Sequence, residues 1–180
     1  SEIEKLIKEN KDLLEEDKRR VEEVIEKLER VIEEDKRRVD EAIKRLDDVA
    51  REIERLRKDS DDKDVERDIR RLEKEVREVV EKSKDLIRRL KEEVERVERT
   101  SRELIKESHK KVREAKERLK DEDLLRRLER VNEEVARRSE DTIRRLREVL
   151  KKIEDDSRRT IDELREVLKR VKTRVTEVRR

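Results

Sequence analysis

The heptapeptide EEDKRRV occupies residues 15–21, and the same seven letters return at residues 33–39. The two copies begin 18 residues apart, which is five full turns of an α-helix at 3.6 residues per turn. Asp35 and Val39 therefore lie on the same side of the helix as Asp17 and Val21. A seven-residue repeat would instead rotate around the helix axis by roughly 20° with each period. The repeat predicts a long, nearly straight helix.

Apolar residues follow helical spacing in three stretches, over residues 3–56, 65–119 and 124–178. Each stretch repeats every 18 residues, and in the third the repeat is almost literal, since Ser139 and Ile143 return as Ser157 and Ile161. The apolar stripe is wide, as is typical of a bundle helix rather than a two-stranded coil. The sequence predicts an all-α protein.

Two polar clusters interrupt the stripes and predict turns, RKDSDDKD at residues 57–64 and KDED at residues 120–123. Asp and Ser favour helix N-caps and compete with the helix through bonds to their own backbone. We therefore expect helices over about 2–58, 62–119 and 122–179, within one domain spanning 1–180. Short connections favour an antiparallel, up-down-up three-helix bundle, elongated because each helix would be about 80 Å long.

The register of the three helices can be predicted by arithmetic. If facing residues sum to 118 between the first two helices and to 240 between the last two, apolar residues meet repeatedly. One such layer contains Val21, Val97 and Ile143, and another contains Leu28, Leu90 and Leu150. The implied turn centres, 118/2 = 59 and 240/2 = 120, fall in or beside the two polar clusters.

The same register gathers the polar residues that interrupt the stripes into three layers, each with a contribution from every helix. These layers are Asp17 with Ser101, Ser139 and Thr142; Asp35 with Ser83, Ser157 and Thr160; and Asn10 with Ser108 and Asn132. A buried carboxylate beside hydroxyls could be an acid or a base, but the two Asp layers would lie about 27 Å apart. We interpret the layers as buried hydrogen-bond networks that penalise wrongly paired helices.

The remaining residues point to no chemistry. The chain has no Gly, Pro, Cys, Met, Trp, Tyr or Phe, which excludes phosphate-binding glycine loops, thiolates and base-stacking aromatics. His109, the single histidine, shares its helical phase with Lys91 and Glu73, so we expect it to be solvated. The Lys and Arg residues between Asp17 and Val21 are also expected to be solvated. We predict no catalytic residue, metal site or cofactor, and hence no enzyme.

Charge and hydropathy restrict the partners. Lys and Arg number 57 against 55 Asp and Glu, giving a net charge of +2 spread evenly along the chain, so we expect no binding of nucleic acid. No apolar run is long enough to span a membrane, and the N-terminus is unlike a signal peptide. We expect a soluble protein without a targeting signal, suited to recombinant cytoplasmic expression, whose compartment is open.

The absence of Gly, Pro, Cys, Met, Trp, Tyr and Phe, the near-exact repeats of 18 residues and the inserted Asp, Ser, Thr and Asn layers together resemble a de novo designed helical bundle. The resemblance is to parametric, nearly untwisted three-helix bundles with buried hydrogen-bond networks, although the turns lack the Gly often placed at helix C-caps. It implies a hyperstable, thermostable, monomeric scaffold that has no native activity and requires no partner. The alternative is a designed interaction or assembly module that exchanges helices or docks on another coiled coil.

Overall fold

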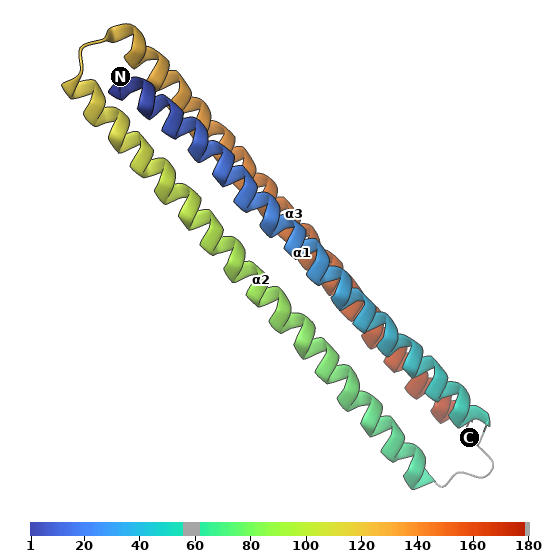
Figure 1. Cartoon of the computed structure of the whole chain (residues 1–180). Coiled ribbons are helices and arrows are strands. Elements are labelled where there is room, and N and C mark those ends of the chain that lie inside the picture. The colour runs from blue at the N-terminus through green and yellow to red at the C-terminus, as the bar shows by residue number, and fades with distance from the viewer. Residues whose placement is uncertain (56–61, 179–180) are drawn as a thin grey trace. The chain divides into compact units, whose positions relative to one another are not determined.

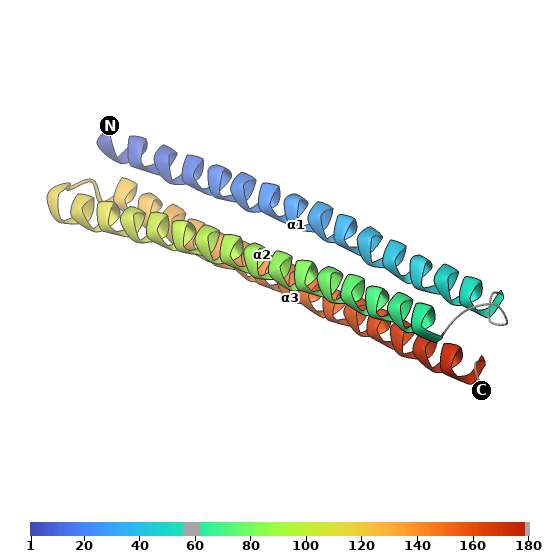
Figure 2. The same cartoon turned by 90° about the horizontal axis from the view of Figure 1, so that it is seen from below.

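The computed structural model describes residues 1–55 and 62–178, and these residues form three helices and no strand. The helices are α1 (Glu2–Arg55), α2 (Asp62–Arg118) and α3 (Glu122–Val178). Figures 1 and 2 show each of them unbroken from end to end, as expected of segments without Pro or Gly. The all-α prediction is confirmed. The predicted end of the first helix at residue 58, that of the third at 179, and residues 57–61 of the first predicted turn lie outside the described residues.

Side-chain caps explain where two of the helices begin. The backbone N–H of Glu4 donates to Ser1 Oγ at 3.3 Å, which satisfies a free donor in the first turn of α1. The backbone N–H of Leu124 donates to Asp121 Oδ1 at 3.2 Å, so an Asp of the predicted KDED turn caps α3. Acidic residues follow both caps in the first helical turn, where they favour the positive end of the helix dipole.

The chain divides into two compact units, each containing one segment of every helix. The first unit comprises Ser1–Leu28 and Leu90–Lys151, and the second comprises Glu29–Arg89 and Lys152–Arg180. In the first unit Asp17 contacts Ser101 while Asn10 contacts Ser108, so α1 and α2 run antiparallel and both pairs sum to 118. The up-down-up three-helix prediction is confirmed, and the organisation into one domain stays a prediction.

The core of each unit is built from the apolar stripes. None of the described apolar side chains is exposed: every one is buried or half-buried. Leu28, Leu128 and Leu146 in the first unit, and Leu164 in the second, are 0% exposed. Burying such a side chain contributes about 1.5–3 kcal/mol, so these stripes supply the main favourable free energy of folding. Over the described residues, no helix is apolar enough along its length to cross a membrane.

Candidate functional site

The most distinctive feature of the first unit is a buried carboxylate that receives two hydroxyl hydrogen bonds. Ser101 Oγ donates to Asp17 Oδ1, and Ser139 Oγ donates to Asp17 Oδ2 at 2.6 Å. The three residues are at most 3% exposed and come from α1, α2 and α3. Hydrogen bonds to an ionised acceptor are stronger than those between neutral groups. The structure thus brings together three of the four residues predicted for this layer.

An arginine on the same helix accompanies this carboxylate. Arg20 Nη1 lies 3.6 Å from Asp17 Oδ1, and the Arg20 side chain is 32% exposed. In the second copy of the heptapeptide, Arg38 Nη1 lies 3.6 Å from Asp35 Oδ1. Residues three apart on a helix are neighbours, which is why the last arginine of each copy reaches back to the aspartate. The expectation that this arginine is merely solvated therefore needs correction.

The Asp35 layer of the second unit is bonded differently. Ser83 Oγ lies 2.8 Å from Asp35 Oδ1 and 3.0 Å from Oδ2, so one hydroxyl hydrogen is shared between two oxygens. Ser157 is 3% exposed. Its hydroxyl has no hydrogen-bond partner among the described residues. Asp35 therefore receives one serine hydroxyl where Asp17 receives two.

The third layer, in the first unit, is a network of side-chain amides and one hydroxyl. Asn132 Nδ2 donates to Asn10 Oδ1 and to Ser108 Oγ, both at 2.7 Å. Ser108 Oγ donates to Asn10 Oδ1 at 2.6 Å, and Asn10 Nδ2 donates to the Leu6 carbonyl at 2.9 Å. Asn10, Ser108 and Asn132 are buried. All three residues predicted for this layer are joined by direct hydrogen bonds.

The two threonines predicted for the Asp layers lie beside them and bond elsewhere. Thr142 Oγ1 donates to the Arg138 carbonyl at 2.7 Å, and Thr160 Oγ1 donates to the Ser157 carbonyl at 2.9 Å. Both threonines are half-buried. A threonine hydroxyl in a helix readily bonds the carbonyl three or four residues earlier, and here that local bond takes the hydroxyl hydrogen.

His109 is not solvated as its helical phase suggested. It is half-buried, and its Nδ1 forms a hydrogen bond with Asn132 Oδ1. The residue follows Ser108 directly, so it lies at the rim of the Asn layer. The residues at the same helical phase, Lys91 and Glu73, did not predict this contact. Long charged side chains extend into water from such positions, whereas the shorter imidazole stays against the neighbouring helix.

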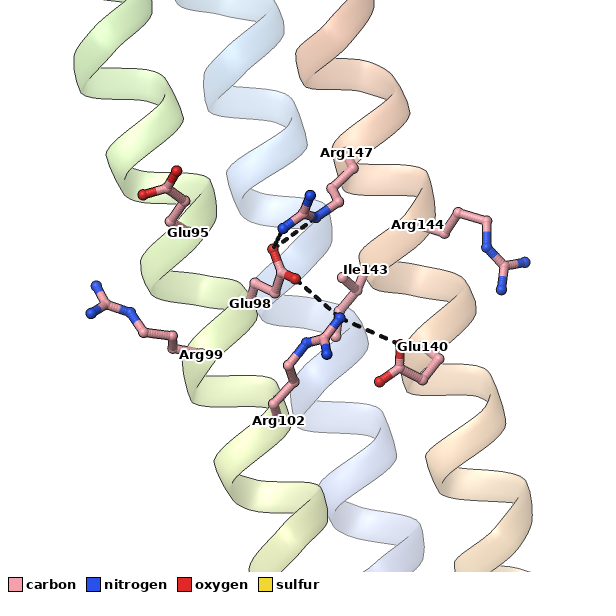
Figure 3. Close-up of a pocket in the computed structure, with 8 residues that line it drawn as sticks. All are labelled: Glu95, Glu98, Arg99, Arg102, Glu140, Ile143, Arg144 and Arg147. Carbon is pink, nitrogen blue, oxygen red and sulfur yellow. Dashed lines mark hydrogen bonds and ion pairs between the residues drawn. The ribbon is translucent and has the colours of Figure 1, made fainter.

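Glu98 was not predicted as a site residue, yet it is 7% exposed. Arg147 of α3 approaches its Oε2 through Nε at 2.9 Å and Nη2 at 2.7 Å (Figure 3). Arg102 Nη2 lies 3.1 Å from Glu98 Oε1 and 3.7 Å from Glu140 Oε2, so it bridges the two glutamates. The hydrogen bond with Glu98, followed by its negative charge, raises the pKa of Arg147 above its ordinary value. Glu98 thus stabilises the charged form of the Arg147 guanidinium.

The sequence did contain a signal for Glu98. One repeat earlier, the same helical phase holds Val80, which is 4% exposed, so a side chain at this phase can be buried. The equivalent positions one repeat later along α2 and one repeat earlier along α3 hold Lys116 and Glu129, which form an ion pair with the charges exchanged. Position 98 therefore carries a carboxylate at a level where α2 faces α3.

The arrangement has limited chemical capacity. Both oxygens of Asp17 are occupied by serine hydroxyls, and all three residues are almost inaccessible to solvent. The groove beside Glu98 is lined by four arginines, three glutamates and Ile143 (Figure 3). Within the described ranges, no group of three or more His, Cys, Asp or Glu side chains is placed to hold a metal ion.

Comparison with known proteins is consistent with the fold. No protein-family model and no curated protein matches the chain. A solved structure described as a computationally designed three helix bundle is similar, with 20% sequence identity and a TM-score of 0.53. The match covers 98% of this chain and 87% of that chain. At this level of identity the similarity shows the three-helix-bundle fold.

Proposed function

We propose that the chain is a designed structural scaffold, a hyperstable monomeric three-helix bundle without native biochemical activity. In this proposal the buried Asp, Ser and Asn layers specify the helix register. The observation that carries it is the Asp17 layer, in which one carboxylate receives a hydroxyl hydrogen bond from each of the other two helices. Such a layer forms only when all three residues lie at the same level.

The energetic argument concerns the alternative registers. A layer of Asp and Ser contributes less stability than well-packed apolar residues would. If α2 or α3 shifted by one helical turn, Asp17 would lose its hydroxyl partners and face apolar side chains. A buried hydrogen-bonding group without a partner costs about 1–3 kcal/mol, and more when it is charged. The layers therefore favour the native register by destabilising the others.

Two further observations support a monomeric and inactive scaffold. The described apolar side chains are all at least half-buried, which leaves no large apolar patch for a second copy. The Ser and Asp side chains of the layers are too deeply buried to meet a substrate, and their carboxylates are already hydrogen-bonded. A similar fold in a designed bundle supports a designed origin.

Light scattering over a wide range of protein concentrations tests the proposal. We expect a single species near the chain mass of 22.2 kDa at every concentration. A mass that rises with concentration would instead favour the assembly module that exchanges helices. The Glu23→Arg variant serves as the matched control, because Glu23 is exposed and its replacement leaves both the core and the layers unchanged.

A further inference from the structure

The histidine at the rim of the Asn layer has a role that neither composition nor helical phase indicates. His109 Nδ1 contacts Asn132 Oδ1, which joins α2 to α3 beside the bonds made by Ser108. Because His109 is the single histidine of the chain, its ring can be observed without interference from another imidazole.

The direction of the hydrogen bonds in this layer is determined by Asn10, at the end of the layer opposite His109. Asn10 Nδ2 donates to the Leu6 carbonyl, so Asn10 Oδ1 must face the interior of the layer. That oxygen accepts from Ser108 Oγ and from Asn132 Nδ2. Rotating the Asn132 amide by 180° would place its oxygen against Asn10 Oδ1, and two acceptors would then oppose each other.

This direction determines what His109 must do. With Nδ2 of Asn132 directed toward Asn10 and Ser108, its Oδ1 faces the imidazole and needs a donor. Neutral imidazole carries one N–H, on either Nδ1 or Nε2. Only a proton on Nδ1 gives Asn132 Oδ1 a donor. A proton on Nε2 would leave the Nδ1 lone pair facing a carbonyl oxygen.

We propose that His109 is the fourth member of the Asn layer, held when neutral as the Nδ1–H tautomer and donating to Asn132 Oδ1. Its N–H completes a one-directional chain of hydrogen bonds that runs from His109 through Asn132 and Asn10 to the Leu6 carbonyl. The imidazole is thus a positioning residue for the Asn132 amide. This role rests on the proposed function of the layers. If the layers specify the helix register, His109 helps to align α2 with α3 in the first unit.

The tautomer can be read directly from the intact protein. Long-range ¹H–¹⁵N correlation spectra, recorded well above the ordinary histidine pKa of about 6.5, distinguish a protonated Nδ1 from a protonated Nε2. We expect the Nδ1–H form to predominate. Predominance of the Nε2–H form, which is favoured in free histidine, would overturn the proposal.

Substitution of the acceptor provides the matched control. In the Asn132→Leu variant the neutral ring should revert to the Nε2–H form, and persistence of Nδ1–H would show that Asn132 is not the cause. His109→Ala should lower the urea midpoint of the parent chain and leave that of the Asn132→Leu chain nearly unchanged. An equal decrease of the urea midpoint in both backgrounds would show that His109 contributes by packing alone. Because the tautomer reports one contact and light scattering reports association, either proposal can fail without the other.

Discussion

Arg20 Nη1 lies 3.6 Å from Asp17 Oδ1, so the repeated heptapeptide contains both the buried carboxylate and a cation placed against it. A charge taken out of water is costly unless it is paired and hydrogen-bonded. The arginine is one-third exposed and so keeps part of its hydration while it screens Asp17. The layer is thus a carboxylate with two hydroxyl donors on the inside and a guanidinium on the outside.

Removing this guanidinium should weaken the fold through Asp17 alone. We expect Arg20→Ala to lower the free energy of unfolding by about 1 kcal/mol, since a partly exposed ion pair is screened by solvent. In an Asp17→Asn background the same substitution should have little effect. Urea unfolding of the four chains in this cycle measures the coupling. Equal losses in both backgrounds would mean that Arg20 stabilises α1 without acting on the carboxylate.

Equivalent serines one repeat apart should differ in their contribution to stability. Ser139→Ala removes a donor to Asp17 and should cost about 1–3 kcal/mol, because a buried acceptor loses its partner. Ser157→Ala removes a buried hydroxyl that has no partner in the described part of the chain, and it should be neutral or slightly stabilising. Chemical denaturation of both variants provides the comparison. A larger loss at Ser157 would show that its hydroxyl donates to Asp35 in solution.

The two sides of the Glu98 ion pair should respond in opposite directions. Glu98→Val places at this phase the residue found one repeat earlier at Val80. It should be neutral or stabilising, because it replaces a buried carboxylate by an apolar side chain and leaves Arg102 and Arg147, which are more than half exposed, free to be hydrated. Arg147→Ala leaves the carboxylate with Arg102 alone and should destabilise by about 1 kcal/mol, a modest value because Arg147 is largely exposed. Thermal unfolding of the two variants gives the comparison. A lower unfolding midpoint for Glu98→Val than for Arg147→Ala would contradict this account.

Core leucines should be ranked by burial. Leu164 is 0% exposed, and its replacement by Ala should cost about 2–5 kcal/mol through lost transfer free energy and the cavity left behind. Leu168, one turn further along α3, is half-buried, and the same change there should cost less than about 2 kcal/mol. Both values follow from urea unfolding. Equal costs would indicate that the two positions are equally enclosed in solution.

Positions along a helix were predictable from the sequence, whereas side-chain conformations were not. Asp17, Ser101 and Ser139 share a level because helical rise and apolar phase fix their register, and arithmetic on residue numbers found them. Whether a hydroxyl turns toward a carboxylate or a backbone carbonyl depends on its rotamer, which explains why Thr142 and Ser157 differ from expectation. Glu98 was missed because a glutamate beside an apolar stripe is normally predicted to be exposed. Its burial becomes evident only when the positions of its arginine partners are known.

The most direct test of the central claim is the helix register of a chain whose Asp17 layer has been made apolar. Asp17, Ser101 and Ser139 would be replaced together by Leu or Ile, and spin labels attached to cysteines introduced at exposed Glu22 of α1 and Glu148 of α3 would report their separation. The account predicts a higher denaturation midpoint together with a broadened or divided distance distribution, against one narrow distribution in the parent. A lower midpoint, or a distribution as narrow as that of the parent, would contradict it.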